Sequence, residues 1–172
     1  HPSLEVIEID EAADRRLLEG LADWCDRYTP LVALEGEAGL FLDITGCTHL
    51  FGREHRMLKE VVTSFMRLGF RARSGLASTP GAAWAVARFH DGVIVPPGDE
   101  KEILSPLPPL ALRLDDATQA SLESVGLRNI GSVAATSRAP LARRFGRQVL
   151  LRLDQALGVL DEAISPRQPV PP

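Results

Sequence analysis

The sequence has 172 residues and a formal net charge of −4, with 45% hydrophobic and 24% charged residues, a composition typical of a globular protein with a sizeable core. No apolar run approaches the ~18–20 residues of a membrane-spanning helix, and the first ten residues lack the basic-then-apolar pattern of a secretory signal. The two cysteines, Cys25 and Cys47, have no metal-binding spacing. We therefore expect a cytoplasmic protein with reduced thiols, no membrane association and no metal or other cofactor.

Charge is unevenly distributed along the chain. The overall negative charge argues against a protein dominated by nucleic-acid binding, and acidic residues concentrate in the first third. Five arginines follow late in the chain, with no acidic residue between the first and the last of them: Arg138, Arg143, Arg144, Arg147 and Arg152. A local basic face is therefore possible on an acidic chain.

The first half of the chain alternates between strand and helix patterns. Short alternating runs predict strands over residues 4–9, 31–35, 40–45, 70–77 and 92–97, with a glycine-rich turn over 36–39. Helical periodicity predicts amphipathic helices over 11–27, with Asp10 as its cap, and over 54–68, while Pro80 is suited to open a helix over 80–89. This order predicts an α/β (α+β) fold in which helices pack on a mixed sheet.

The second half is predicted to be helical in short pieces. A Pro, Gly and charge-rich stretch over 97–106 is the best candidate for a linker after an α/β domain over 1–96. Helices are expected over 115–125, 130–135, 139–145 and 147–157, inside a small all-helical domain over 107–163. The proline-rich tail over 164–172 is expected to be extended.

Three segments resemble the Y-family of translesion DNA polymerases. Residues 29–32 (Thr-Pro-Leu-Val) and 42–46 (Leu-Asp-Ile-Thr-Gly) match the two ends of a palm segment of that family, at the family's spacing. Residues 74–77 with Ala83 resemble its Ser-x-Gly-Ile-Ala block, and residues 122–146 resemble its helix-hairpin-helix thumb. The resemblance implies a partial palm over 1–96, without the N-terminal strand and fingers, then a thumb-like domain and a tail that leads toward an absent little finger.

The departures from the family pattern fall on residues that would contact metal or phosphate. The family's catalytic Asp-Glu pair falls on Ala38 and Gly39, its phosphate-contacting lysines on Pro80 and Trp84, and the glycines of its first thumb hairpin on Arg113 and Asp115. Nucleotidyl transfer needs two Mg²⁺ ions held by converging carboxylates. A methyl group and a hydrogen atom cannot supply those ligands, so these degenerate positions predict a pseudo-polymerase with no metal site.

This set of losses resembles the ImuB-like, non-catalytic branch of the family. The resemblance implies a scaffold in DNA-damage-induced translesion synthesis and mutagenesis, with a sliding clamp, an ImuA-type RecA-like protein and a C-family error-prone polymerase as partners. Phosphate contact is a plausible use of Arg143, Arg144, Arg147 and Arg152, and a solvated helix face is the alternative. Because Asp115 and Asp116 would repel a phosphate backbone, any DNA binding is expected to be weak and salt-dependent.

Two other functions remain open. The chain could belong to an active translesion polymerase in which Glu37, one residue from the family's Asp position, replaces the lost acid through a bulge at Gly36 or Gly39. It could also be a stand-alone DNA-binding module. Asp43 is expected to accept a local hydrogen bond from the backbone near Thr45 and not to bind metal.

Overall fold

The computed structural model describes residues 8–167, and the chain divides into two compact units. Unit 1 comprises residues 1–50 and 164–172, and unit 2 comprises residues 51–163. The linker expected over 97–106 lies inside unit 2, and the boundary between the two units falls elsewhere. The division into domains 1–96 and 107–163 stays a prediction. Among the residues described, every helix is too short or too polar to span a membrane.

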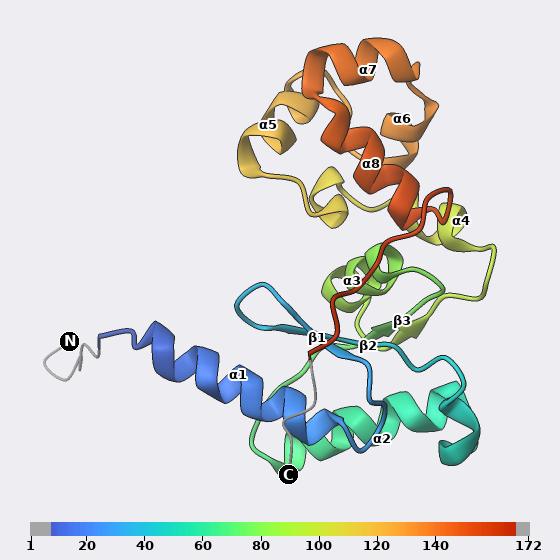
Figure 1. Ribbon diagram of the computed structural model, residues 1–172. Coiled ribbons are helices and arrows are strands. Elements are labelled where there is room, and N and C mark those ends of the chain that lie inside the picture. Colours follow the sequence, from blue (N-terminus) through green and yellow to red (C-terminus); the bar gives the residue numbers. More distant parts are fainter. Residues whose placement is uncertain (1–7, 168–172) are drawn as a thin grey trace, which may run out of the picture. The chain divides into compact units, whose positions relative to one another are not determined.

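Unit 1 begins with helix α1, Glu11–Cys25 (Figure 1). As predicted, Asp10 caps it, because the Asp10 Oδ1 atom accepts a hydrogen bond from the Ala13 N–H at 2.8 Å. Leu18, Ala22 and Cys25 form its buried stripe. Burial raises the pKa of the Cys25 thiol to about 11, which favours the protonated, unreactive form. The strand expected over 4–9 lies mostly outside the described residues.

A β-hairpin follows α1. Strand β1, Val32–Glu35, pairs antiparallel with β2, Gly39–Leu42, and Val32 faces Leu42 in the register. Val32 and Ala33 are buried. The buried Thr29 hydroxyl donates a hydrogen bond to the Asp43 carbonyl oxygen at 2.5 Å, which fixes the entry of the hairpin to its exit. Helix η1, Thr48–Phe51, is a 3-10 turn that comes after the hairpin.

The described part of the tail, residues 164–167, also belongs to unit 1. The Arg167 N–H donates to the Val32 carbonyl oxygen at 2.8 Å. Its guanidinium contacts α1 twice, at the Glu19 carbonyl oxygen (2.8 Å) and the Asp23 carboxylate (2.7 Å). The tail is therefore tied to α1 and β1 up to this point.

Unit 2 contains α2, Glu54–Arg67, and a small parallel β-α-β unit. Strands β3, Gly75–Leu76, and β4, Val93–Ile94, pair in parallel and flank α3, Pro80–Phe89, which Pro80 opens as predicted. The strands are shorter than expected, and the sheet consists of two separate two-stranded pieces in the described residues. A Cβ atom at Gly75 would lie 2.5 Å from the Ala87 nitrogen, so α3 can lie against β3 only because this residue is glycine.

The rest of unit 2 is helical. Short helices α4, Glu100–Leu104, and η2, Pro109–Leu112, lead into α5, Asp116–Ser124, α6, Ile130–Ala135, α7, Arg138–Phe145, and α8, Arg147–Ala156. In Figure 1 the helices α5, α6 and α7 surround α8. One core joins these helices to α3, with fully buried side chains at Val86, Leu104, Leu112, Leu122, Ile130, Leu141 and Val149.

Helix α4 lies in the segment that was expected to be a linker. Leu104 is fully buried, and the Ser105 carbonyl oxygen accepts a hydrogen bond from the Gly131 N–H at 2.9 Å. Helices α3 and α8 also lie close together. The hydroxyl of Thr79, which caps α3, donates a hydrogen bond to the carbonyl oxygen of Ala156 in α8 at 3.0 Å. The segment 97–106 thus includes residues that pack within unit 2.

Candidate functional site

The turn between β1 and β2, residues 36–38, is where sequence places the degenerate metal positions. Glu35 and Gly39 are the last paired residues of the two strands, and Gly36 has a positive φ of 58°. Glu37 and Ala38 are exposed at the tip. A Cβ atom at Gly39 would lie 2.6 Å from the Glu35 carbonyl oxygen. A side chain at position 39 would therefore require this hairpin to shift.

The acids near this turn are not arranged as a metal site. Among the described residues, no cluster of three or more His, Cys, Asp or Glu side chains could hold a metal ion. The Asp43 carboxylate accepts a hydrogen bond from the Thr45 N–H at 2.9 Å, which confirms the predicted local role of this residue. Ala38 offers only a methyl group and Gly39 none, so neither supplies the oxygen ligand that Mg²⁺ prefers.

The segment 113–115 joins η2 to α5 and contains the two positions that the resemblance assigns to glycines of the first thumb hairpin. Arg113 has a φ of 56°, the only positive value at a non-glycine residue in the part of the chain described. The left-handed region that glycine adopts freely is thus occupied by an arginine. The shape of a glycine-containing turn is kept here without the glycine.

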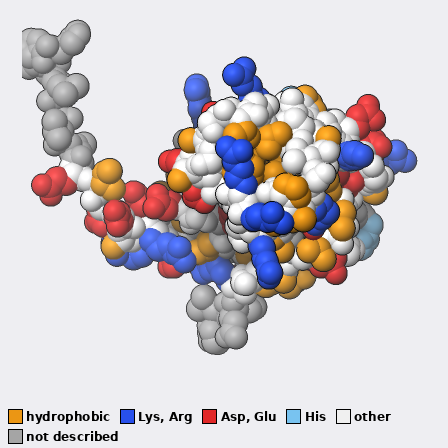
Figure 2. All heavy atoms as spheres, turned by 90° about the horizontal axis from the view of Figure 1, so that it is seen from above, with side chains coloured by type: hydrophobic (Ala, Val, Ile, Leu, Met, Phe, Trp, Pro, Cys, Tyr) orange, Lys and Arg blue, Asp and Glu red, His pale blue; other side chains and the backbone are white. Residues whose placement is uncertain are grey.

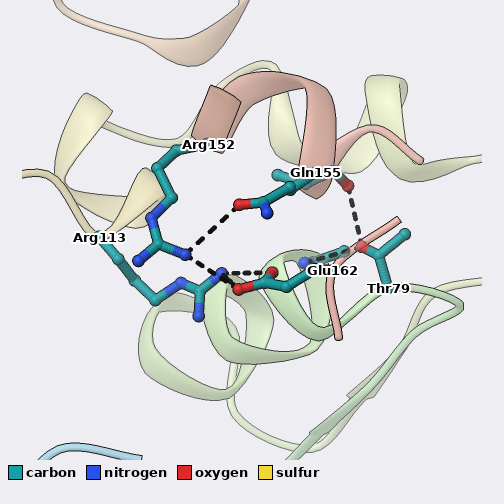
Figure 3. A network of polar contacts seen from close by, with 7 residues as sticks. Thr79, Arg113, Arg152, Gln155 and Glu162 are labelled. Atoms are coloured by element: carbon teal, nitrogen blue, oxygen red, sulfur yellow. Dashed lines mark hydrogen bonds and ion pairs between the residues drawn. The ribbon is translucent and has the colours of Figure 1, made fainter. Parts of the chain in front are cut away.

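The side chain of Arg113 is used inside unit 2 (Figure 3). Its Nη2 atom donates to both carboxylate oxygens of Glu162, at 2.6 and 2.5 Å, and Arg152 Nη1 donates to the same carboxylate at 2.9 Å. The Arg113 and Glu162 side chains are only 9% and 11% exposed. The network joins the residue after η2 to α8 and to the segment that follows α8. No local sequence pattern predicts these contacts.

Asp115 fills the N-terminal end of α5. Its carboxylate accepts hydrogen bonds from the N–H and the hydroxyl of Thr118, both at 2.8 Å. The backbone hydrogen bond from Thr118, strengthened by the hydroxyl, lowers the pKa of Asp115 below its ordinary value. A helix N-terminus attracts anions, and here the chain's own carboxylate takes that position.

Three of the four predicted phosphate-contacting arginines remain exposed. Arg143 and Arg144 lie in the last turn of α7, and Arg147 is the first residue of α8, after Gly146, whose φ is 90°. We call these three residues the arginine face. The Arg144 guanidinium lies 5.4 Å from the centre of the Phe145 ring. Figure 2 shows basic side chains gathered on this helical side, with few acidic ones between them.

The fourth predicted arginine, Arg152, is placed differently. Its side chain is only 27% exposed and its guanidinium is bound to Glu162 and Gln155. The structure does not support the predicted phosphate contact for Arg152, because its guanidinium already binds the carboxylate of Glu162. The neighbouring Arg138 is similarly engaged, since its two terminal nitrogens bind the two carboxylate oxygens of Asp154.

The two positions that the resemblance assigns to phosphate-contacting lysines carry no charge. Pro80 is the first residue of α3, where its fixed φ suits the helix start. Trp84 is half-buried, and the Arg88 guanidinium lies 5.4 Å from the centre of its ring. This arrangement is that of a packed aromatic side chain and not of a cationic phosphate clamp.

Comparison with known proteins identifies similar chains. No family model matches the sequence. The chain is 51% identical to Protein ImuB of Caulobacter vibrioides over 172 residues, which are 99% of this chain and 38% of that protein. It is 32% identical over 142 residues to DNA polymerase IV 2 of Mesorhizobium japonicum, covering 77% of this chain and 33% of the relative. The chain thus spans less than two fifths of the length of these curated relatives.

Solved structures show the same fold. A Y-family DNA polymerase chimera of Dbh and Dpo4 superimposes with a TM-score of 0.79 at 12% identity, over 97% of this chain and 51% of that one. DinB from Sulfolobus solfataricus gives a TM-score of 0.77 at 13% identity, over 96% of this chain and 50% of that one. The mixed helix and sheet fold predicted from sequence is confirmed.

Proposed function

Because the chain is an ImuB-like fragment of the Y-family of DNA polymerases, we propose that it is part of a non-catalytic scaffold in DNA-damage-induced translesion synthesis and mutagenesis. In this account the polymerase-type fold is kept for its surfaces and its metal site is given up. The chain spans 38% of the length of that ImuB relative, so the activity and partners of the whole protein are part of the proposal.

One observation supports the loss of catalysis more than any other. At position 39 a Cβ atom would come within 2.6 Å of the Glu35 carbonyl oxygen, so a side chain there would require the turn to shift. Two-metal catalysis requires several carboxylates that converge on ions about 3.5–4 Å apart. Ala38, the neighbouring position, contributes only a methyl group, and the hairpin closes without either ligand.

Primer extension tests this proposal. Full-length protein is mixed with a primed template, Mg²⁺ and the four deoxynucleoside triphosphates, alongside an active DinB-type polymerase as the positive control. We expect no extension above the protein-free blank. Extension that disappears with Glu37→Ala would overturn the scaffold proposal in favour of an active polymerase with a displaced acid. Glu37 is the candidate for the displaced metal-binding acid, because it is adjacent to Ala38 and its side chain is exposed at the tip of the turn.

We further propose that the arginine face contacts DNA phosphates weakly. Arg143, Arg144 and Arg147 are exposed and, within the described residues, none of them is ion-paired. Three phosphate contacts correspond to a slope of roughly −2.7 in log K against log salt, or about a 40-fold loss of affinity between 50 and 200 mM salt. The cap at Asp115 limits affinity further, since its carboxylate repels a phosphate at the adjacent turn.

Duplex DNA binding by fluorescence anisotropy tests the arginine face. The triple variant Arg143→Ala, Arg144→Ala, Arg147→Ala is expected to lose most of the affinity and most of the salt dependence. A matched control removes three cations from α2, Arg56→Ala, Lys59→Ala and Arg67→Ala, and should bind DNA as the parent does. Affinity that survives 200 mM salt without loss would instead support a stand-alone DNA-binding module.

The partners implied by the resemblance are also proposals: a sliding clamp, an ImuA-type RecA-like protein and a C-family error-prone polymerase. A scaffold must bind at least one of them directly. Size-exclusion chromatography of full-length protein with each purified partner tests this, and failure to co-elute with all three would contradict the scaffold role while leaving the absence of catalysis untouched.

A further inference from the structure

Helix α2 and the loop after it carry an excess of positive charge. Residues 53–73 include six basic side chains and two acidic ones, on a chain whose net charge is −4. By sequence count, unit 2 has 15 Lys and Arg against 12 Asp and Glu, whereas unit 1 has 4 against 11. The six basic side chains are all exposed: Arg53, Arg56, Lys59, Arg67, Arg71 and Arg73.

These cations lack internal partners. Within residues 8–167, none of the six side chains forms an ion pair with a carboxylate. Other arginines of unit 2 do find such partners, since Arg138 binds Asp154 and Arg152 binds Glu162. The lack of ion pairs among the six cations of residues 53–73 is therefore not a general property of unit 2.

Arg56, Lys59 and Arg67 share one side of α2. They lie with Thr63 at spacings of three, four and four residues, which places all four on one helical stripe about 16 Å long. The same side chains, with Glu60 and Ser64, line a shallow groove of about 410 Å³. The opposite side of α2 carries the buried Met57 and Phe65. The stripe is thus an outward, cationic groove on a helix anchored by its other side.

Apolar side chains accompany the cations. Met66 is 61% exposed and Leu68 is 45% exposed at the end of α2. Met66 falls three residues after Thr63 and seven after Lys59, so it belongs to the same stripe. Methionine and arginine are enriched in protein interfaces. This mixture fits a protein surface with acidic and apolar residues better than a nucleic-acid backbone, which offers only phosphates along its edge.

We propose that the α2 stripe, comprising Arg56, Lys59, Thr63, Met66 and Arg67, docks an acidic amphipathic helical segment of a partner protein. The carboxylates of that segment pair with Arg56, Lys59 and Arg67, and its apolar side chains cover Met66. This inference does not depend on the proposed absence of catalysis, nor on the identity of any partner.

The test uses a defined probe. A fluorescein-labelled 16-residue peptide with Glu on one helical face and Leu on the adjacent face is titrated with the 172-residue chain at 50 and 200 mM salt. Arms with a charge-reversed Lys/Leu peptide and with a 16-base-pair duplex use the same protein. We expect saturable binding of the acidic peptide, weaker at the higher salt, and no binding of the Lys/Leu peptide. Weak duplex binding is expected to come from the arginine face and not from the α2 stripe.

Two matched variants separate local from global charge. Arg56→Glu, Lys59→Glu and Arg67→Glu together should lower the peptide affinity at least about 10-fold, as expected for three exposed charge pairs reversed. Arg143→Glu, Arg144→Glu and Arg147→Glu change the net charge equally and should leave peptide affinity within about twofold. At 200 mM salt, Met66→Gln should weaken the remaining binding, because its apolar contact is not screened.

Three results would overturn the proposal. They are the absence of saturable peptide binding, an equal loss of affinity in both triple variants, and a loss of duplex DNA affinity confined to the α2 variant. The last result would assign the stripe to nucleic acid. All substituted residues are exposed, and circular dichroism with thermal melting verifies that each variant is folded.

Discussion

Two turns of this molecule hold positions that the resemblance assigns to functional residues of the Y-family, and they depart from the family pattern in opposite ways. At the end of the turn at residues 36–38 and in the first residue of β2, Ala38 and Gly39 occupy the positions predicted for the catalytic acids, and the tip of the turn is exposed. In the turn at 113–115, glycine positions have become Arg113 and Asp115, whose side chains are engaged in ion pairing and helix capping. The first turn has lost side chains and the second has gained them.

The difference shows what each turn now contributes. At the first turn a Cβ atom at Gly39 would lie 2.6 Å from the Glu35 carbonyl oxygen, so a side chain at this position requires the turn to shift. At the second turn Arg113 keeps the left-handed conformation of a glycine while its guanidinium holds Glu162. Arg113 is therefore a structural link within unit 2, at a position where the resemblance predicts a glycine.

Removing Glu162 gives the largest expected effect. Glu162→Gln leaves Arg113 and Arg152 without the carboxylate that both bind, and breaking a buried pair in this way costs about 3–5 kcal/mol of unfolding free energy. Chemical denaturation of the 172-residue chain measures it. Glu123→Gln, which removes an exposed carboxylate hydrogen-bonded to Gln119, is the control and should cost less than about 0.5 kcal/mol. Equal costs for the two variants would show that the second turn is not a structural link.

Adding side chains at Ala38 and Gly39 should have different effects on stability at the two positions. Gly39→Ala adds a Cβ atom against the Glu35 carbonyl oxygen, and overpacking of this kind costs about 1–3 kcal/mol. Ala38→Asp adds a larger side chain at an exposed position and should change stability by less than about 0.5 kcal/mol. Thermal melts of both variants test the order. A Gly39→Ala protein as stable as the parent would mean that the hairpin can accept a ligand after all.

The charge of Asp115 gives the smallest effect, visible in its pH dependence. Hydrogen bonds from Thr118 lower the pKa of Asp115 in the folded state, so its stabilising contribution is present above the unfolded-state pKa of about 3.9 and is lost as the pH falls through the lowered value. Asp115→Asn keeps a capping side chain without the charge. The melting temperature of the parent should therefore exceed that of the variant at pH 6, and the gap should close below about pH 4.

Asp116→Asn is the matched control for this experiment. Asp116 is the exposed neighbour in the same first turn of α5, and Asp115 rather than Asp116 receives the Thr118 hydrogen bonds. The pH dependence of its melting temperature should follow the parent more closely. If both variants behave alike, the general helix dipole and not the cap explains the effect.

Local rules predicted much of this fold. Asp10 and Pro80 begin their helices as expected, and Asp43 bonds Thr45, because each of these contacts depends on residues within four positions in sequence. Helix α4 was missed because prolines and glycine flank a five-residue helix, whose buried residues Glu100 and Leu104 are set by tertiary packing. The β3 and β4 strands have two paired residues each, too few to set their ends from alternation.

The candidate site was predictable to the same degree. The position of the degenerate turn follows from sequence spacing, but the steric exclusion at Gly39 depends on the strand register. Arg152 was expected to be available for phosphate, and its partner Glu162 lies in a segment with no regular pattern. Arg113 and Glu162 are 49 residues apart, so only the tertiary packing brings them together.

The most direct test of the central claim is whether the turn at 36–38 can seat a divalent ion with a nucleotide. Mn²⁺ and a deoxynucleoside triphosphate are titrated into the ¹⁵N-labelled chain while the amide resonances of Gly36, Ala38 and Gly39 are followed by NMR. The account predicts no selective paramagnetic broadening at these three amides relative to other exposed residues. Selective broadening that reverses with a chelator and disappears in Glu37→Ala would contradict it.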